Sequence, residues 1–233
     1  MASPAMSGNH AEGHARLHAD QQALARIGAA VRERLDADPA MHKLAVERAE
    51  IYALSDFLSA AECAHLIKMI DDSARPSETF DAVNQAGYRT SYSGDVDPHD
   101  SFVRMIERQL SDLLGLDASW SETFQGQRYE PGQEFREHCD WFDTRASYWP
   151  NEVKRGGQRS WTAMVYLNTV KEGGTTEFTR LGIRIPPQQG ALIVWNNALP
   201  DGSPNHDTLH AARPVIRGVK YVITKWFRTR RWS

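Results

Sequence analysis

Three stretches in the first half of the chain carry apolar residues at helical spacing. Between residues 15 and 35 the apolar positions recur every three, four or seven residues, which predicts an amphipathic helix. Ser59 and Glu62 form the signature of a capping box, so a second helix is expected to begin there. A third amphipathic stretch covers residues 101–114, and the following Gly115 suits a helix end.

The pattern changes after residue 122, where short runs of β-prone residues alternate with turn residues. Strands at short spacing without intervening helices are typical of an antiparallel sandwich or barrel. The second and third helices are then expected to pack on the outer face of one sheet. The predicted strands are 50–54, 123–129, 134–142, 162–168, 182–185, 191–195, 210–214 and 220–227.

Composition places the chain among ordinary globular proteins. Its 233 residues suffice for a sizeable core, and a net charge of −3 argues against a partner bound by broad phosphate neutralisation, so no nucleic acid is expected. Two cysteines, Cys63 and Cys139, are too few for a disulfide scaffold, and no apolar run suggests a signal peptide or membrane span. We therefore expect a cytoplasmic protein without membrane contact. The basic C-terminal residues are interpreted as a solvated strand end: Lys225, Arg228, Arg230 and Arg231.

The residues with the clearest chemistry are His138 and Asp140. On a strand, alternate side chains share a face, so these two project together while Cys139 points away. An imidazole beside a carboxylate supplies two ligands of the 2-His-1-carboxylate group that binds non-haem Fe(II). His210 is a candidate for the third ligand, and Lys220, ten residues further on, could meet a carboxylate.

Ordered sequence blocks around these residues resemble the 2-oxoglutarate- and Fe(II)-dependent oxygenases, in their prolyl 4-hydroxylase branch. The resemblance covers roughly residues 48–230. It implies an α+β, mainly β fold: a double-stranded β-helix (jelly-roll) core in a domain of residues 48–233, with residues 1–47 as an N-terminal arm. The blocks are Tyr129-x-x-Gly132-Gln133, His138-x-Asp140, Gly156-Gly157-Gln158-Arg159-x-x-Thr162, Tyr166-Leu167-Asn168, Gly173-Gly174-x-Thr176, Gly190-Ala191-Leu192, His210-x-x-x-Pro214-Val215-x-x-Gly218-x-Lys220 and Trp226.

The resemblance also implies roles for individual residues. It makes His138, Asp140 and His210 the catalytic Fe(II) ligands. Lys220 would bind the distal carboxylate of 2-oxoglutarate with help from the hydroxyls of Tyr129 and Thr176, Trp226 would line this pocket, and Arg159 would contact a peptide substrate. Taken alone, each has a plainer explanation: a surface histidine, an exposed strand lysine, a sheet aromatic, a turn threonine, a core tryptophan or a loop arginine.

Two other residues compete for places in the ligand set. His206 lies in a polar loop four residues before His210, whereas His210 begins the block that ends at Lys220. Asp143 stands five residues after His138 and breaks the strand alternation, so it is assigned to a loop. Residues 143–155 are interpreted as a loop that could cover the site.

The reaction implied by the resemblance is hydroxylation of a C–H bond with O2, releasing succinate and CO2, with ascorbate as an auxiliary reductant. The expected substrate is a prolyl residue in a peptide or protein. Phe135 stands where the family commonly has tyrosine and removes a hydroxyl that could touch a peptide. A free amino acid is the other substrate considered. Two other classes are considered: a cupin-like isomerase or hydrolase, which gives Lys220 no role, and a non-catalytic binding module, which predicts a damaged ligand set. The oligomeric state is not predicted.

Overall fold

The computed structural model describes residues 8–77 and 87–233, with side chains from residue 20 onward. The helices are α1 (Gly8–Ala37), α2 (Ala60–Ser73), α3 (Ser101–Leu114) and the short α4 (Trp149–Lys154), with two 3-10 turns at Ala118–Trp120 and His206–Thr208. The sequence predicted the three long helices, although α1 begins earlier than residue 15. Helix α4 lies where only a loop was expected.

Helices α2 and α3 begin and end as their sequences predict. Ser59 accepts a hydrogen bond from the backbone N–H of Glu62, and the Glu62 carboxylate accepts one from the Ser59 backbone N–H at 2.7 Å, which completes the capping box. Asp100 caps α3, and Gly115 ends it in the left-handed region with φ of 66°.

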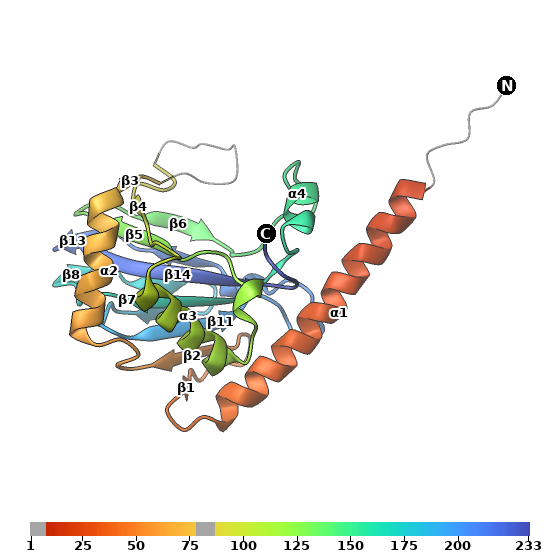
Figure 1. Ribbon diagram of the computed structural model, residues 1–233, viewed down its shortest axis with the longest axis horizontal. Helices are drawn as coiled ribbons and strands as arrows, with labels where there is room; N and C mark the ends of the chain where they lie inside the picture. Colours follow the sequence, from red (N-terminus) through yellow and green to blue (C-terminus); the bar gives the residue numbers. More distant parts are fainter. Residues whose placement is uncertain (1–7, 78–86) are drawn as a thin grey trace.

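All strand pairs are antiparallel and form two facing sheets, a mainly β jelly-roll with helices on one side (Figure 1). The large sheet has the order β1-β2-β11-β7-β14-β5-β4-β3, and the smaller has β10-β9-β12-β6. A two-stranded ribbon, β13-β8, lies beside them. The strands are β1 (His42–Lys43), β2 (Ile51–Leu54), β3 (Arg75–Pro76), β4 (Tyr92–Asp95), β5 (Gln125–Tyr129), β6 (Phe135–His138), β7 (Arg159–Tyr166), β8 (Glu172–Gly173), β9 (Thr176–Phe178), β10 (Ile183–Ile185), β11 (Leu192–Asn196), β12 (His210–Ala212), β13 (Val215–Arg217) and β14 (Lys220–Arg228).

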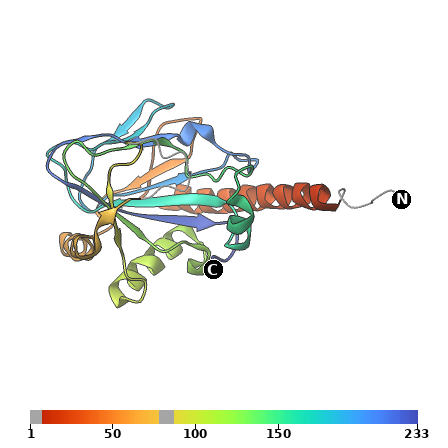
Figure 2. The ribbon, with the colours of Figure 1, turned by 90° about the horizontal axis from the view of Figure 1, so that it is seen from above.

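The large sheet separates two hydrophobic cores. Strand β7 shows how: Ala163 and Val165 face the helices, whereas Met164 and Tyr166 face the smaller sheet. The outer core receives α1, α2 and α3, which cover that side of the strands (Figure 2). The inner core fills the space between the sheets except at the end where polar side chains gather. The expected packing of helices on one sheet is therefore confirmed.

The interpretation of the C-terminal basic residues as a solvated strand end was wrong for Lys225 and Arg228, whereas Arg230 and Arg231 are exposed. Lys225 is fully buried and its Nζ lies 2.5 Å from the Glu107 carboxylate on α3. Arg228 is 1% exposed and pairs with Glu152 on α4. Burying such groups requires a counter-charge, and that charge comes from helices distant in sequence.

None of the helices in the described part of the chain combines the length and apolarity needed to cross a membrane. The two cysteines are both free.

Two glycines allow α2 to approach the large sheet closely. A Cβ at Gly126 would lie 2.5 Å from Ile70 Cγ1 and 2.9 Å from the Gly94 carbonyl oxygen, and a Cβ at Gly94 would lie 2.7 Å from Ile70 Cα. The contact between helix and strands thus depends on the absence of side chains at both positions.

We expect Gly126→Ala to destabilise the protein by about 1–3 kcal/mol, because the added methyl group must push Ile70 and α2 away from β5. Urea unfolding measures the effect. Gly182→Ala is the control: its Cβ meets nothing within 4 Å, so only the cost of its φ of 68° remains, about 1 kcal/mol. Equal losses from the two variants would show that the close approach of α2 is unimportant.

Candidate metal centre

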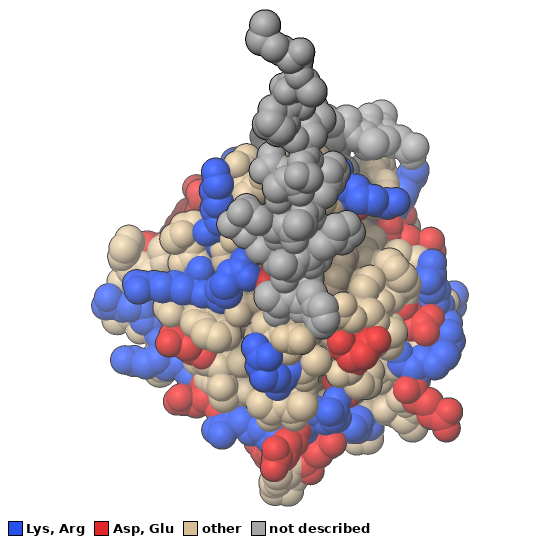
Figure 3. Space-filling model, turned by 90° about the vertical axis from the view of Figure 1, so that its right-hand side faces the viewer, with Lys and Arg blue, Asp and Glu red and all other residues tan. Residues whose placement is uncertain are grey.

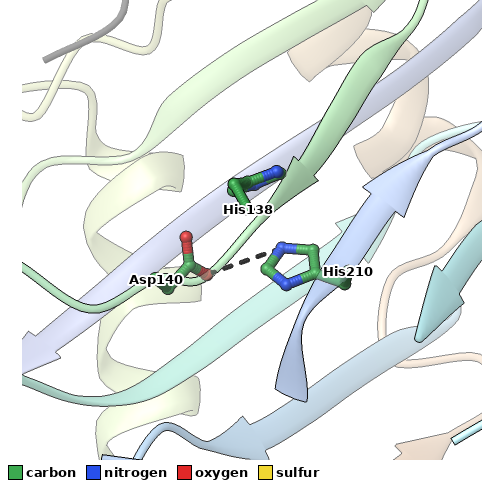
Figure 4. A group of neighbouring side chains, drawn as sticks. All are labelled: His138, Asp140 and His210. Atoms are coloured by element: carbon green, nitrogen blue, oxygen red, sulfur yellow. Dashed lines mark ion pairs between the residues drawn. The ribbon is translucent and has the colours of Figure 1, made fainter. Parts of the chain in front are cut away.

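Strand pairing brings the two histidines together. His138 ends β6, His210 begins β12, and the two residues are direct partners across these antiparallel strands. Their ring centroids are 4.2 Å apart. Asp140, two residues beyond His138, turns to the same side, and its Oδ2 lies 3.9 Å from Nε2 of His210 (Figure 4). One ligand atom from each residue lies within 4.8 Å of the others.

Both imidazole rings are oriented by backbone carbonyls. Nδ1 of His138 lies 2.8 Å from the Arg136 carbonyl oxygen, and Nδ1 of His210 lies 3.0 Å from that of Thr208. A carbonyl only accepts, so Nδ1 carries the proton in each ring and Nε2 keeps its lone pair. Burial, reinforced by the neighbouring His210, lowers the pKa of His138 to about 3, so this ring is neutral at physiological pH.

Asp140 is an ionised carboxylate despite its burial. Burial alone would raise its pKa, but His210, His138 and then Arg159 outweigh that cost and hold the pKa below its usual value. The Thr162 hydroxyl donates to Oδ2 at 2.9 Å. Two imidazoles that present Nε2 and one carboxylate held in its ionised form are the ligand set of non-haem Fe(II), so the residues present fit that metal.

A pocket leads from this centre to a buried lysine. Lys220, at the start of β14, is 1% exposed, and its Nζ lies 3.4 Å from the Thr176 hydroxyl and over the rings of Tyr129 and Tyr166 at 5.3 and 5.4 Å. Within residues 20–77 and 87–233, whose side chains are described, it forms no ion pair, and burial lowers its pKa to about 7. A buried ammonium group without a counter-charge fits a carboxylate ligand such as that of 2-oxoglutarate.

The structure brings most of the predicted site residues into this one pocket. His138, Asp140 and His210, which could hold a metal ion, form one end of it, and the residues predicted to bind the cosubstrate line its walls: Tyr129, Thr176, Lys220 and Trp226. The competing residues lie outside the ligand group. His206 is exposed in a 3-10 turn, and Asp143 is exposed and pairs with Arg145.

Arg159 occupies a different position from the other predicted residues. Its guanidinium binds the Glu122 carboxylate through two contacts of 2.7 and 2.9 Å and stacks on the Trp226 ring at 4.0 Å. It also lies 3.9 Å from Oδ1 of Asp140, and the residue is 9% exposed. The side chain is therefore held by an internal partner beside the metal-binding carboxylate.

Three residues of the site had no role in the sequence interpretation: Gln127, Thr162 and Tyr166. Tyr129 donates its hydroxyl proton to the Gln127 side chain at 2.6 Å, and Tyr166 donates to Thr176 at 2.7 Å. Thr162 contacts Asp140. Strand alternation from Tyr129 could have identified Gln127, while Thr162 and Tyr166 already belonged to the recognised blocks.

Comparison with known proteins agrees with this geometry. The family model of the 2OG-Fe(II) oxygenase superfamily matches residues 124–228. Among curated proteins, a probable prolyl 4-hydroxylase 8 from Arabidopsis thaliana is 31% identical over 211 residues, covering 80% of this chain and 70% of its own length. Prolyl 4-hydroxylase 5 from the same plant is 32% identical over 206 residues, covering 77% and 68%.

Solved structures include a viral collagen prolyl hydroxylase from Paramecium bursaria Chlorella virus-1, determined as a 2OG complex. It superposes with a TM-score of 0.60 at 27% identity and covers 76% of this chain and 95% of its own. The fold, the ligand set and these relatives lead to one conclusion: the chain belongs to the 2OG-Fe(II) oxygenase superfamily, in its prolyl 4-hydroxylase-like branch, and is a 2-oxoglutarate-dependent dioxygenase.

Proposed function

We propose that this dioxygenase hydroxylates prolyl residues in a peptide or protein. The observation that carries the proposal is the single pocket that joins the His138–Asp140–His210 group to Lys220, which has no ion pair with the described residues, in a chain whose relatives are named prolyl 4-hydroxylases. When bound, Fe(II) and 2-oxoglutarate supply the oxidising chemistry that puts one oxygen atom of O2 into the substrate C–H bond and the other into succinate, with loss of CO2.

In this proposal the protein supplies the ligand atoms in a fixed arrangement. His138 and His210 present Nε2 because their Nδ1 atoms face backbone carbonyls, and Asp140 presents a carboxylate oxygen. All three belong to one edge of the site, which leaves the opposite side of the centre for the other reactants.

Lys220 and its neighbours bind the far end of 2-oxoglutarate. The ammonium group neutralises the distal carboxylate, and the hydroxyl of Thr176 gives it a polar partner. Tyr129 and Tyr166 enclose Nζ with their rings, so the ion pair forms away from water. The cupin-like and non-catalytic alternatives are not favoured, since neither uses this lysine and the ligand set is intact.

Trp226 is the residue at which a second cavity meets the metal pocket. This residue lines the metal pocket and also a polar cavity of about 210 Å³ bounded by Arg75, Asp95, Glu122, Gln125 and Trp232. A polar cavity extending beyond the metal pocket favours a chain substrate over a free amino acid, because flanking peptide groups need hydrogen-bond partners. The peptide-binding role of Arg159 stays a prediction, since its guanidinium is already bound to Glu122.

The charge on one face of the molecule does not favour a polyanionic substrate. On the face shown in Figure 3, Lys and Arg alternate with Asp and Glu and form no broad basic area. The cytoplasmic location and the use of ascorbate stay predictions.

The activity is tested by incubating the protein with Fe(II), 2-oxoglutarate, ascorbate and proline-containing peptides. Mass spectrometry is expected to find one added oxygen per proline, with succinate formed in equal amount. His210→Ala should abolish both products because the metal loses a ligand. Succinate formed without any peptide product, across diverse proline sequences, would exclude prolyl hydroxylation while keeping the dioxygenase assignment.

A second prediction concerns the stability of the ligand-free protein. Lys220→Met should increase the free energy of unfolding by a few kcal/mol, because it removes a buried charge without a counter-charge. Lys225→Met is the matched control: that lysine is equally buried but paired with Glu107, so its loss should destabilise. Urea unfolding of both variants measures the contrast. Destabilisation by Lys220→Met comparable to that by Lys225→Met would show that Lys220 has a structural partner.

Proton uptake on 2-oxoglutarate binding provides the third test. The pKa of Lys220 is about 7 in the free protein, so above pH 7 the lysine must gain a proton to pair with the carboxylate. Calorimetry with Mn(II)-loaded protein in buffers of different ionisation enthalpy should give uptake of about half a proton at pH 7 and nearly one at pH 8, with affinity falling as pH rises. Lys220→Arg stays charged and should take up none. Equal uptake by both proteins would assign the proton to another group.

A further inference from the structure

A chain of hydrogen bonds behind the metal centre connects three segments of the protein. The Asn197 side-chain amide donates to the Thr162 hydroxyl at 2.9 Å, and that hydroxyl donates to Oδ2 of Asp140 at 2.9 Å. Thr162 is fully buried in the middle of β7, and Asn197, just after β11, is 2% exposed. Neither residue lines the pocket, so neither can touch 2-oxoglutarate or substrate.

The protons available on each group fix which atom donates in these two hydrogen bonds. A hydroxyl has one proton, and an amide NH2 group can only donate. Because Asn197 donates to Thr162, the threonine proton is available for Asp140 alone. The amide is placed by its backbone, whose N–H donates to Ser160 at 2.8 Å and whose carbonyl accepts from Asn205 at 3.0 Å.

The amide orientation agrees with this direction. Oδ1 of Asn197 has no hydrogen-bond partner in the part of the chain that the structure describes. Exchanging the amide atoms would place two buried N–H donors where the lone oxygen now lies, and would turn the Thr162 proton toward Asn197 and away from Asp140. Two unsatisfied donors cost more than one unsatisfied acceptor in this position.

The Thr162 hydrogen bond determines how the Asp140 carboxylate is oriented. The terminal torsion of an aspartate rotates over a broad range, so a ligand carboxylate needs a partner that fixes its plane. Arg159 is 3.9 Å away, beyond hydrogen-bond distance, and the buried Trp226 N–H makes no hydrogen bond of ordinary geometry with the described residues. Among the described residues, Thr162 is the side chain that makes a hydrogen bond of normal geometry with Asp140.

We propose that Thr162 is a positioning residue that fixes the Asp140 carboxylate for metal binding, and that Asn197 acts through it by holding the hydroxyl in the donating orientation. The proposal rests on the proposed function, because it assigns Asp140 to the metal.

The experiment measures Mn(II) affinity of the full chain by electron paramagnetic resonance of the free ion, together with the charge-transfer band of the Fe(II)–2-oxoglutarate protein. Thr162→Val keeps the shape and β-preference of the residue but removes the donor, and should weaken Mn(II) binding about 10- to 100-fold and shift the band. Thr162→Ser restores the hydroxyl and should bind within about threefold of the wild type.

Asn197→Ala provides a second, independent variant. It should weaken Mn(II) binding by up to about tenfold, and the double variant should bind no more weakly than Thr162→Val alone, because Asn197 acts only through the hydroxyl. If the losses of Mn(II) affinity from the two substitutions add in the double variant, Asn197 does not act through Thr162. Thermal unfolding of the metal-free proteins separates loss of fold from loss of affinity; if Thr162→Val does not fold, Thr162→Ser and Asn197→Ala decide the question by the same criteria.

The possible failures are distinguishable. Wild-type protein that binds neither Mn(II) nor 2-oxoglutarate would remove the proposed function. Two results would overturn the positioning role alone, provided that the wild type binds Mn(II). One is a Thr162→Val variant whose Mn(II) affinity and charge-transfer band are unchanged. The other is Mn(II) binding that is weakened equally in the Thr162→Ser and Thr162→Val variants.

Discussion

The register between β6 and β12 is the constraint on which the site depends. His138 and His210 are 72 positions apart in the sequence but direct partners across two antiparallel strands. A shift of one residue would turn one imidazole to the other face of the sheet, and no side-chain adjustment could recover it. The smaller sheet therefore fixes the distance between the two histidines. Strand β12 pairs with β9 on its other side and packs on the inner core, and both contacts keep it in this register.

Buried charge is the second feature that organises the molecule. Lys225, Arg228 and Arg159 are all buried, and each meets a glutamate: Glu107, Glu152 and Glu122. Lys220 is equally buried and lacks such a partner among the described residues. The contrast distinguishes buried cations that stabilise the fold through an internal partner from a buried cation that has no such partner. The paired groups fasten α3, α4 and the segment before β5 to the large sheet. Lys220 is the exception, and in our proposal its counter-charge comes from a bound carboxylate.

Sequence reasoning succeeded where the signal is local and failed where it is not. The capping box of Ser59 and Glu62, the apolar spacing of α3 and the alternation of His138 with Asp140 all lie within a few residues, and the structure has each as expected. The ion-pair partners of Lys225, Arg228 and Arg159 are 118, 76 and 37 residues away, so nothing near these residues distinguishes a buried cation from a solvated one. Strand β9, of three fully buried residues, is too short for periodicity to show.

The three ligands differ in how their orientation is secured. Each histidine ring is held by a backbone carbonyl two residues earlier in the chain, a group that no side-chain substitution can remove. Asp140 is held by the hydroxyl of a residue 22 positions away on another strand. The carboxylate is thus the ligand whose geometry depends on side-chain identity elsewhere in the fold. A metal enzyme of this kind must hold its metal while leaving positions open for reactants. Substitution of Thr162 could therefore change metal affinity without replacing any of the three ligands.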